Sequence, residues 1–410
     1  MKYEKLGSIF TITSGGTPLT SNRKYYENGN IPWVKTGDLK LKYLKEVPDS
    51  ITKTGLENSS AKIFPPKTVL IAMYGATIGA CSILKIAAST NQACGAILPN
   101  EKVNEEYLYY YLSSIKQSFI NKGVGGGQPN ISATILKETK FPLIPISDQL
   151  HIANSLSQAE NLIAQRKESI RLLDEFLKSS FLEMFGTPSV NKKRFQKGTI
   201  RDVAKEVKYG TSSPAEDDGQ YPYLRMNNIT TEGYWDFSKM KYININEKDK
   251  EKYVVRRGDL LFNRTNSKEL VGKTGVFNEE AEMIIAGYLI RVRTNEKANP
   301  WYLWGYLNSV HGKQTLFGMC KSIVGMANIN AQELQSIKVL IPPIELQNQF
   351  AQIVESTEVI KAQYQSSLQE LERLYGSLSQ RAFKGELRAK DEEMMMAAEP
   401  KGTYQNKTNS

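Results

Sequence analysis

The sequence has few of the residues that build metal centres and disulfides. It contains 3 cysteines and 2 histidines among 410 residues. Neither the cysteines, Cys81, Cys94 and Cys320, nor the histidines, His151 and His311, form a cluster along the chain. This distribution excludes a Cys/His zinc site, and a sparse, odd set of cysteines is typical of a protein in the reducing cytosol. We therefore predict no bound metal and no disulfide framework.

Long hydrophobic runs are also missing. The most extended apolar stretches, such as residues 69–73, are far shorter than the roughly 20 residues that a membrane-spanning helix needs. Residues 1–6 lack the apolar core of a signal peptide. These absences predict a cytoplasmic protein without a membrane association.

Positive charge is in excess. The chain carries 53 Lys and Arg against 43 Asp and Glu, which gives a net charge of +10. This balance suits a polyanionic partner better than an acidic small molecule. A solvated basic surface without a particular partner is the alternative, and charge alone leaves both interpretations open.

One stretch of the chain occurs twice in the same register. Each copy starts in a glycine-containing loop, passes a proline-rich exit and continues into a long heptad-patterned segment. Four residue pairs are each 198 positions apart: Asn130 and Asn328, Pro145 and Pro343, Gln149 and Gln347, and Phe185 and Phe383. A repeat of this length indicates two structural units, each made of a globular part followed by a long helix.

The globular parts, residues 1–148 and 188–343, have the pattern of mixed α/β domains. Short β-branched or aromatic runs alternate with turn-forming residues. In the first part we expect one helix from 104 to 121, with Asn104 as its N-cap. The offset between matching positions drifts from 190 to 195 within these parts before it settles at 198. The two parts therefore share a scaffold and differ in their loops, as two modules that read different things would.

The long segments, 149–187 and 344–388, carry a seam of mostly apolar residues at alternating steps of four and three. This spacing predicts two helices that bury their seams against each other as a coiled coil. We expect the pair to be antiparallel, because each helix emerges from its own globular part and antiparallel packing places the two parts at opposite ends. The helix from 149 to 185 would be about 55 Å long, and residues 389–410 are expected to be a disordered tail. The predicted fold class is therefore α+β, with two globular mixed α/β domains, each followed by a long helix. The predicted helix-pair interface consists of Ile152, Leu156, Ile163, Ile170, Leu173, Leu177, Phe350, Val354, Tyr364, Leu368, Leu371 and Tyr375.

The duplicated plan resembles the DNA-specificity subunit of type I restriction–modification enzymes. The resemblance covers nearly the whole chain to about residue 388. Besides the order of domains and helices, it rests on local patterns: WVKTGD at 33–38, GATIG at 75–79, TNQA at 90–93, and the Ile-Pro exits that precede Gln149 and Gln347. No single pattern is decisive, but their order and their duplication are specific.

The resemblance implies that each globular part is a target-recognition domain that docks in a DNA major groove. The two domains would read the halves of a bipartite target in double-stranded DNA, and the paired helices would fix the length of the gap between them. The helices would also offer surface to two methyltransferase subunits, which restriction/translocation subunits can join. S-adenosylmethionine, ATP and Mg are expected on those partner subunits, and no cofactor is expected on this chain.

Loop residues with suitable donors are the candidates for DNA contact. Arg and Lys pair with guanine, and Asn and Gln pair with adenine. The candidates in the first unit are Arg23, Lys24, Lys35, Thr36, Tyr74, Thr77, Asn91, Gln92 and Gln128. Those in the second unit are Arg225, Met226, Asn227, Arg264, Thr265, Asn266, Lys268, Lys273 and Tyr288. The alternative for Thr77 and Asn91 is that they hold turns through backbone hydrogen bonds.

Catalytic patterns are missing. The glycine run at 123–127 lacks the Gly-Lys-Ser/Thr ending of a phosphate-binding loop. Asp202, Glu206 and Lys208 superficially suggest a nuclease, but the first unit has no equivalent set, so we interpret them as a solvated face. We therefore predict a non-catalytic, sequence-specific DNA-binding subunit. A protein–protein scaffold with two adaptor domains, and a nuclease or methyltransferase in its own right, are the alternatives.

Overall fold

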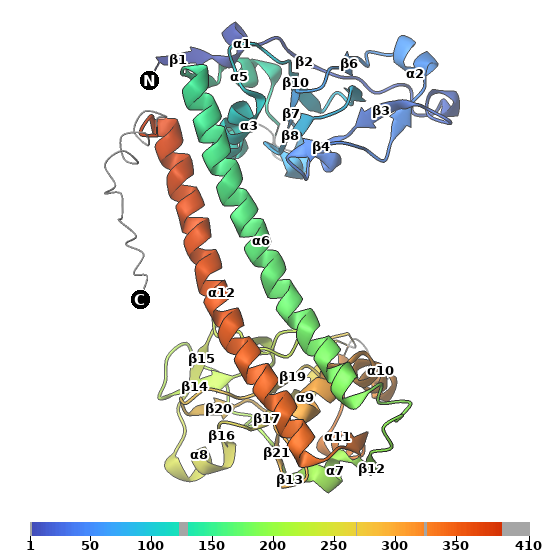
Figure 1. The fold of residues 1–410 in the computed structure, drawn as a ribbon, viewed down its shortest axis with the longest axis vertical. Helices are drawn as coiled ribbons and strands as arrows, with labels where there is room; N and C mark the ends of the chain where they lie inside the picture. The colour runs from blue at the N-terminus through green and yellow to red at the C-terminus, as the bar shows by residue number, and fades with distance from the viewer. Residues whose placement is uncertain (1, 123–129, 268, 324–325, 388–410) are drawn as a thin grey trace, which may run out of the picture. The chain divides into compact units, whose positions relative to one another are not determined.

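The structure is a computed structural model that describes residues 2–122, 130–267, 269–323 and 326–387. Contacts within the chain divide it into two units (Figure 1). Unit 1 comprises residues 1–166 and 367–410, and unit 2 comprises residues 167–366. Each unit therefore contains one globular part and segments of both long helices. The predicted tail, 389–410, lies outside the described residues.

Unit 1 contains two main sheets built from short strands. The first has the order β2-β10-β7-β8-β4, with bounds Ile12–Ser14, Cys94–Ile97, Val69–Ala72, Cys81–Leu84 and Tyr43–Leu44. The second has the order β5-β3-β9-β6, with bounds Ser50–Ile51, Ile31–Val34, Ala88–Thr90 and Ile63–Phe64. A ribbon pairs β1 (Lys2–Lys5) with β11 (Lys140–Leu143). Every residue of β7, β8 and β10 is buried, so the first sheet lies in the core of the unit.

The helices of unit 1 are short apart from the long pair. They are α1 (Leu6–Ile9), α2 (Lys53–Glu57), α3 (Glu105–Ser114), α4 (Lys116–Lys122) and α5 (Ala133–Glu138), with 3-10 turns η1 (Arg23–Tyr25), η2 (Thr36–Asp38) and η3 (Gly75–Thr77). The single helix predicted over 104–121 is thus two helices, which separate at Ile115. Its predicted N-cap is confirmed, because the Asn104 side chain accepts hydrogen bonds from the N–H groups of Glu106 and Tyr107, both at 3.0 Å.

The described residues of unit 2 repeat this strand plan, with four strands instead of five in the first sheet and with one further sheet. Its first sheet has the order β13-β21-β17-β19, with bounds Ala204–Tyr209, Leu289–Thr294, Leu260–Asn263 and Thr274–Val276. The second has the order β15-β14-β20-β16, with bounds Lys241–Ile243, Tyr221–Leu224, Met283–Ile285 and Val254–Val255. A ribbon pairs β12 (Gln196–Thr199) with β24 (Lys338–Ile341). A third sheet has the order β18-β23-β22, with bounds Thr265–Asn266, Met326–Asn328 and Lys321–Ile323.

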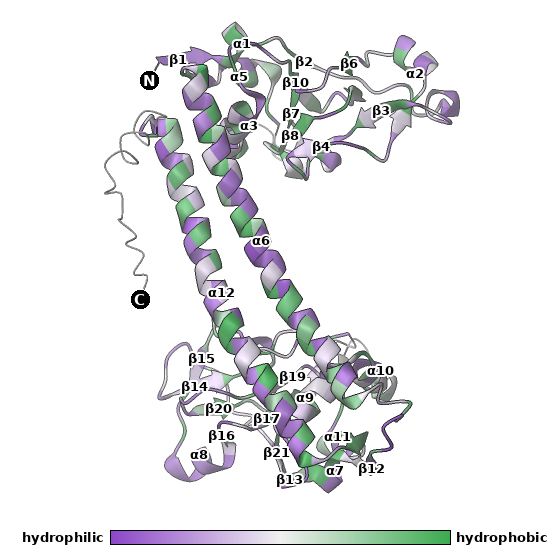
Figure 2. Ribbon diagram, viewed as in Figure 1, coloured by the Kyte–Doolittle hydropathy of each residue, from purple (hydrophilic) through white to green (hydrophobic). Residues whose placement is uncertain are grey.

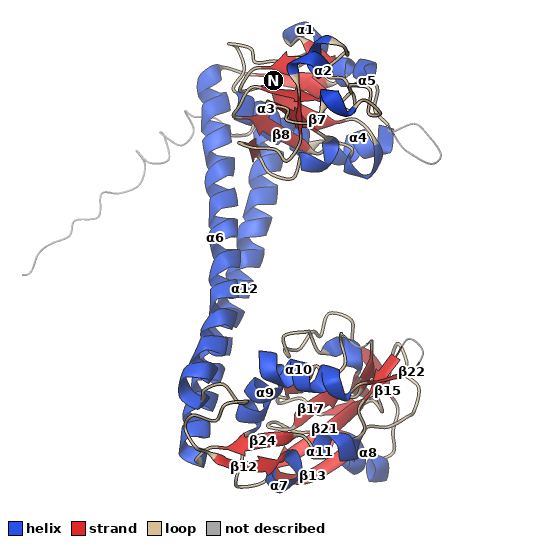
Figure 3. Cartoon of the chain, turned by 90° about the vertical axis from the view of Figure 1, so that its right-hand side faces the viewer, coloured by secondary structure: helices blue, strands red, loops and turns tan. Residues whose placement is uncertain are grey.

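The short helices of unit 2 follow the order of those in unit 1 along the chain. Figure 3 shows both sets of helices with the strands of their own units. They are α7 (Ile200–Val203), α8 (Glu247–Tyr253), α9 (Pro300–Asn308), α10 (Val310–Met319) and α11 (Ala331–Gln335), with the 3-10 turn η4 (Met226–Asn228). In sequence and place, α9, α10 and α11 correspond to α3, α4 and α5. The predicted sharing of one scaffold between the two parts is therefore visible in both sheets and helices.

The two long helices are α6 (Ile146–Phe185) and α12 (Ile344–Lys384). Helix α6 begins three residues before the predicted 149, α12 begins at the predicted 344, and both end before the predicted 187 and 388. Every predicted interface residue is buried or half-buried. In Figure 2, apolar and polar residues alternate along both helices, as one buried seam per helix requires.

Within each unit the two helix segments run antiparallel. The core of unit 1 contains Ile152 and Leu156 near the start of α6 together with Ala382 near the end of α12. The core of unit 2 contains Phe181 near the end of α6 together with Phe350 near the start of α12. The predicted antiparallel pairing is confirmed.

The repeated phenylalanines close these cores. The ring of Phe383 lies 5.7 Å from the ring of Tyr107 and 5.3 Å from the ring of Tyr111, both on α3. The ring of Phe185 lies 4.8 Å from the ring of Tyr302 on α9. Each globular part therefore holds the start of the helix that follows it and the end of the other long helix.

Candidate nucleic-acid interface

A 3-10 turn presents a cationic residue at the same place in both units. In unit 1 the turn η2 follows β3, and the Lys35 N–H donates to Oδ2 of Asp38 at 2.7 Å. In unit 2 the turn η4 follows β14, and the Arg225 N–H donates to Oδ1 of Asn228 at 3.0 Å. The third residue of each turn thus closes it with its side chain. The predicted candidates Lys35 and Arg225, and likewise Thr36 and Met226, are structural equivalents.

Both cations already have partners in this structure. Nζ of Lys35 forms an ion pair with Asp49 at 2.8 Å and lies 5.3 Å from the Trp33 ring. Nη2 of Arg225 donates to the carbonyl oxygen of Lys239 at 2.8 Å. Since the Lys35–Asp49 pair is about 40% exposed on both sides, it is of the weak surface kind that a phosphate or base could replace.

Several other candidates lie on exposed loops. Arg23 and Lys24 form the exposed turn η1. Tyr74 is 42% exposed. Gln92 is exposed and accepts a hydrogen bond from the hydroxyl of Thr17. These four side chains are accessible to a ligand.

Thr77 and Asn91 make the local bonds that the alternative interpretation expects. The Thr77 hydroxyl donates to the carbonyl oxygen of Tyr74 at 3.3 Å, and Oδ1 of Asn91 accepts from the N–H of Ala93 at 3.2 Å. Both side chains therefore hold turns, and contact between either one and DNA stays a prediction. Gln128 and Lys268 lie outside the described residues.

Arg264 is held by an aromatic side chain that the sequence did not single out. Its guanidinium carbon lies 4.9 Å from the centre of the Tyr209 ring. The Arg264 N–H donates to the carbonyl oxygen of Tyr288 at 3.0 Å, and the Tyr288 side chain is 53% exposed. Tyr209, at the end of β13, is 55 positions from Arg264 in the sequence, so only the pairing of strands brings the two together.

The equivalent place in unit 1 has different side chains. In unit 2, Tyr209 on β13 pairs with Ile290 on β21. On the equivalent strands of unit 1, β2 and β10, Ser14 pairs with Gly95. Ser14 is therefore the counterpart of Tyr209. The N–H of Met73 donates to the carbonyl oxygen of Ala93 at 2.9 Å, as the N–H of Arg264 does to that of Tyr288. A Tyr, Arg, Tyr set in unit 2 thus replaces a Ser, Met, Ala set in unit 1.

The neighbouring candidates of Arg264 lie on β18. The hydroxyl of Thr265 donates to Oδ1 of Asn328 at 3.1 Å. Oδ1 of Asn266 accepts from the N–H of Ser267 at 2.9 Å. Asn227, on η4, is exposed.

Lys273 has a role that differs from the predicted DNA contact. Its side chain is 8% exposed, and its ammonium donates to the carbonyl oxygens of Met226, at 2.8 Å, and of Ile229. Burial lowers the pKa of Lys273 below the ordinary lysine value. Lys273 therefore stabilises the turn η4 through hydrogen bonds to backbone carbonyl groups. It is not among the side chains that we expect to contact DNA.

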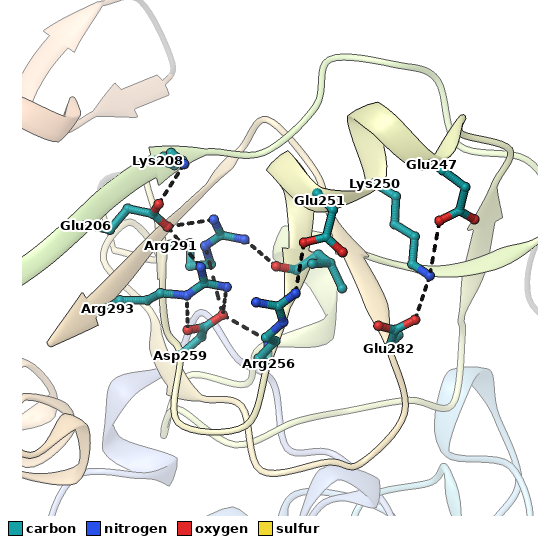
Figure 4. Close-up of polar contacts among 11 residues, drawn as sticks. Glu206, Lys208, Glu247, Lys250, Glu251, Arg256, Asp259, Glu282, Arg291 and Arg293 are labelled. Carbon is teal, nitrogen blue, oxygen red and sulfur yellow. Dashed lines mark hydrogen bonds and ion pairs between the residues drawn. The ribbon is translucent and has the colours of Figure 1, made fainter.

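The residues that superficially suggested a nuclease have structural partners, and Figure 4 shows those of Glu206 and Lys208. Asp202 closes the start of α7, because its Oδ2 accepts from the N–H of Thr199 at 2.7 Å. Oε1 of Glu206 accepts from Nη2 of Arg291 at 2.8 Å, and its Oε2 forms an ion pair with Lys208 at 2.6 Å. The expected solvated face is thus partly wrong, because Arg291 is only 1% exposed and Glu206 is half-buried.

Asp259 and Arg293 complete this network. Nε of Arg293 donates to Oδ1 of Asp259 at 2.8 Å, and Asp259 is 3% exposed. Arg291 pairs with Leu261 across the sheet as Ala96 pairs with Leu70, so unit 1 has Ala96 where unit 2 has a buried arginine. The network therefore belongs to the second unit, and its ion pairs between neighbouring strands give it a structural role.

The comparison with protein families decides the identity of both units. The family described as "Type I restriction modification DNA specificity domain" matches residues 1–172 and again residues 192–373. The chain belongs to this family. Because the two matches are the two copies of the repeat, the duplication in the sequence is a duplication of the specificity domain. The resemblance noted in the sequence is confirmed.

Relatives in the specificity family span the chain. The EcoKI specificity subunit of Escherichia coli (strain K12) is 22% identical over 392 residues, which cover 89% of this chain and 84% of the relative. The MjaIX specificity subunit of Methanocaldococcus jannaschii is 31% identical over 187 residues, which cover 44% of this chain and 43% of the relative.

Two solved structures described under type I restriction–modification systems share the fold. An S subunit of a type I restriction–modification system from M. genitalium superposes with a TM-score of 0.56 at 15% identity, covering 93% of this chain and 96% of that chain. A structure described under complex assembly and conformational transition of the type I R-M system gives a TM-score of 0.56 at 19% identity, with 94% and 98% covered. The predicted fold class is confirmed.

None of the helices in the described ranges is long and apolar enough to cross a membrane. In the same part of the chain, no group of three or more His, Cys, Asp or Glu side chains could hold a metal ion.

The buried network of unit 2 makes a testable prediction about stability. Replacing Arg291 by Met leaves the half-buried Glu206 and the buried Asp259 short of a partner, which we expect to cost about 3–5 kcal/mol of unfolding free energy. The control is Arg257→Met, which removes an exposed ion pair with Glu280 and should cost less than about 1 kcal/mol. Chemical denaturation of both variants at pH 7 measures the difference.

The contribution of Glu206 to the free energy of unfolding should depend on pH in a defined direction. Burial alone would raise the pKa of Glu206, but the bonds from Lys208 and Arg291 outweigh it and hold the pKa below its ordinary value. The stabilisation is therefore present above the unfolded pKa, about 4.3, and is lost as pH falls through the lower folded value. The difference in unfolding free energy between wild type and Arg291→Met should become smaller as the pH is lowered from 7 to below 4. A difference that becomes larger on acidification contradicts the lowered pKa of Glu206.

Proposed function

We propose that the chain is the non-catalytic, sequence-specific double-stranded DNA-binding subunit of a type I restriction–modification complex. Each unit reads one half of a bipartite target, and the paired long helices fix the length of the gap between the halves. One observation carries this proposal: two copies of the specificity domain share their sheets and helices while the side chains at equivalent loop positions differ.

The difference at those positions has the chemistry of base reading. In unit 2, Arg264 offers a guanidinium that is preorganised on the Tyr209 ring, and arginine pairs with O6 and N7 of guanine through two hydrogen bonds. Unit 1 has Met73 at that position and offers Arg23, Lys24 and Gln92 on other exposed loops. Two such surfaces would prefer different base sequences, as an asymmetric bipartite target requires.

Partner subunits would dock on apolar side chains that the long helices leave exposed. In unit 2, Leu172 and Phe176 on α6 are each 49% exposed, and Val359 and Ile360 on α12 are 59% and 40% exposed. In unit 1, Leu162 on α6 is 49% exposed. These residues lie outside the seam and gain from being covered. We assign this surface to two methyltransferase subunits.

The chemistry of the complex would reside on those partners. S-adenosylmethionine would be bound by the methyltransferase subunits, and ATP and Mg by restriction/translocation subunits that join the assembly. This chain would contribute target choice alone. We place the complex in the cytoplasm, because a sparse, odd set of cysteines is typical of a reducing compartment.

Selection from a random duplex pool tests the proposal. The chain, purified together with its methyltransferase subunit, should enrich two short motifs separated by a gap of one length, and binding should fall steeply with salt because lysines and arginines displace counterions. Absence of any enriched motif would favour a protein scaffold and contradict the proposal. Turnover by the single chain with DNA, metal and S-adenosylmethionine would instead indicate an enzyme.

A variant of Arg264 tests the reading surface of unit 2. Arg264→Met should relax the preference at one base pair in one half of the motif, since a bidentate pair contributes about 1–3 kcal/mol of discrimination. The other half and the gap should stay unchanged. Arg201→Met, an exposed arginine on α7 outside the candidate set, is the matched control. Equal motifs from wild type and Arg264→Met would remove Arg264 from the reading surface.

Copurification tests the partner surface. Leu172→Ser should weaken retention of the methyltransferase subunit, because it places a hydroxyl in the apolar contact. Leu41→Ser is the control, since Leu41 is 69% exposed on the globular part of unit 1. Equal retention by the two variants would place the methyltransferase elsewhere.

A further inference from the structure

A glutamine in the first turn of each long helix is completely buried. Gln149 on α6 is 0% exposed, and so is Gln347 on α12. Buried polar groups persist where their hydrogen bonds are satisfied. The two positions belong to the set of residues that repeat at an offset of 198.

Gln149 ties three backbone segments together. Its Oε1 accepts from the N–H of Asn104 at 2.9 Å, and Asn104 caps α3. Its Nε2 donates to the carbonyl oxygen of Lys102 at 2.9 Å and to that of Ile144 at 2.8 Å. Lys102 and Asn104 belong to the globular part, whereas Ile144 is in the exit that leads into α6. One side chain thus joins the helix to the domain that precedes it.

Gln347 makes the same three bonds in unit 2. Its Oε1 accepts from the N–H of Asn299, the N-cap of α9, at 2.9 Å. Its Nε2 donates to the carbonyl oxygen of Lys297 at 3.0 Å and to that of Pro342 at 2.8 Å. The geometry of the junction is therefore duplicated as a whole.

The junction has the same hydrogen bonds in both units although the number of residues between its two sides differs. The partners on the globular side, Lys102 and Asn104, are each 195 positions from Lys297 and Asn299. The glutamines and their partners in the exits are 198 positions apart. Unit 2 thus has three more residues between these two sides, and the junction still closes in the same way.

An amide suits this junction and other side chains do not. The site presents one N–H donor and two carbonyl acceptors, and an amide offers a matching acceptor and two donors. A carboxylate would set an oxygen against the two carbonyls, and an apolar side chain would leave all three backbone groups without the amide as their partner.

Small angular errors at this junction would have large effects along the helix. Helix α6 has 40 residues, so it is about 60 Å long. A tilt of about 5° at its base would displace its far end by about 5 Å. One base pair step corresponds to about 3.4 Å along the DNA. A gap of a single length therefore requires a stiff junction at the start of each helix.

We infer that Gln149 and Gln347 are positioning residues that fix the angle at which each long helix leaves its globular part, and that they thereby restrict the complex to one gap length. This inference rests on the proposed reading of a bipartite target. A second tie lies beside each glutamine, because the hydroxyl of Tyr107 donates to the carbonyl oxygen of Pro142 and that of Tyr302 donates to that of Leu340, both at 2.9 Å.

Gap selectivity of the complex measures this role. The wild-type complex first defines the two half-site motifs from a random duplex pool. Duplexes with those motifs and gaps one or two base pairs shorter or longer are then offered to Gln149→Met, to Gln347→Met and to the wild type. Methionine keeps the length of the side chain and removes all three hydrogen bonds. Gln158→Met and Gln352→Met, exposed glutamines on the same helices, are the controls.

We expect each junction variant to keep the half-site motifs while its preference for the wild-type gap over the neighbouring gaps falls at least tenfold. The controls should keep the wild-type preference. A folded variant with unchanged gap preference, or one that loses the half-site motifs, overturns the inference. Gln149→Asn and Gln347→Asn are measured in parallel, and if both variants of a junction fail to fold, its glutamine serves stability and the inference falls. If the wild type enriches no split motif, the proposed function itself fails.

Discussion

Each globular part completes its core with two helix segments that come from distant parts of the chain. The core of unit 1 includes Leu156 from the start of α6 and Ala382 from near the end of α12. The core of unit 2 includes Phe350 from the start of α12 and Phe185 from the end of α6. Burial of apolar side chains drives this packing, and it gives each long helix one end in each core. The rest of the fold depends on this contribution of one end of each long helix to each core.

This arrangement separates two tasks within one chain: the helices join the globular parts, and the loops of the globular parts read the target. Helix ends and exits repeat in a constant register, with Phe185 and Phe383 closing the two cores on Tyr302 and Tyr107. Loops that follow the strands of the two first sheets vary. Where unit 2 stacks Arg264 on Tyr209, unit 1 has smaller or apolar side chains. A scaffold of this kind can change what it reads without changing how the readers are joined.

The sequence predicted the parts of this fold that depend on periodicity. The seam residues follow from spacing along the chain, because a helix places residues three and four apart on one face. The antiparallel helix pair follows from the order of globular parts and helices, and the matching of Gln149 with Gln347 follows from the constant offset of 198. The break between α3 and α4 was missed, since both helices carry apolar residues in one continuing pattern.

The side-chain contacts of the second unit were not accessible in this way. Lys273 was interpreted as a surface cation, yet it lies immediately before β19 and donates to the carbonyl oxygen of Met226 in the turn η4. Tyr209 and Arg264 meet through strand pairing, as do Glu206 and Arg291, which are 85 positions apart. Such contacts depend on sheet register, and loop and sheet geometry is not encoded in local spacing.

The central claim is that reading and spacing reside in different parts of the chain. Inserting four helical residues into α6 between Leu156 and Ile163, with a matching insertion into α12 between Val354 and Lys361, lengthens the paired helices by about 6 Å. Selection from a random duplex pool by the assembled complex should then return the wild-type half-site motifs separated by a longer gap. Altered half-site motifs, or wild-type motifs at the original gap, would contradict the account.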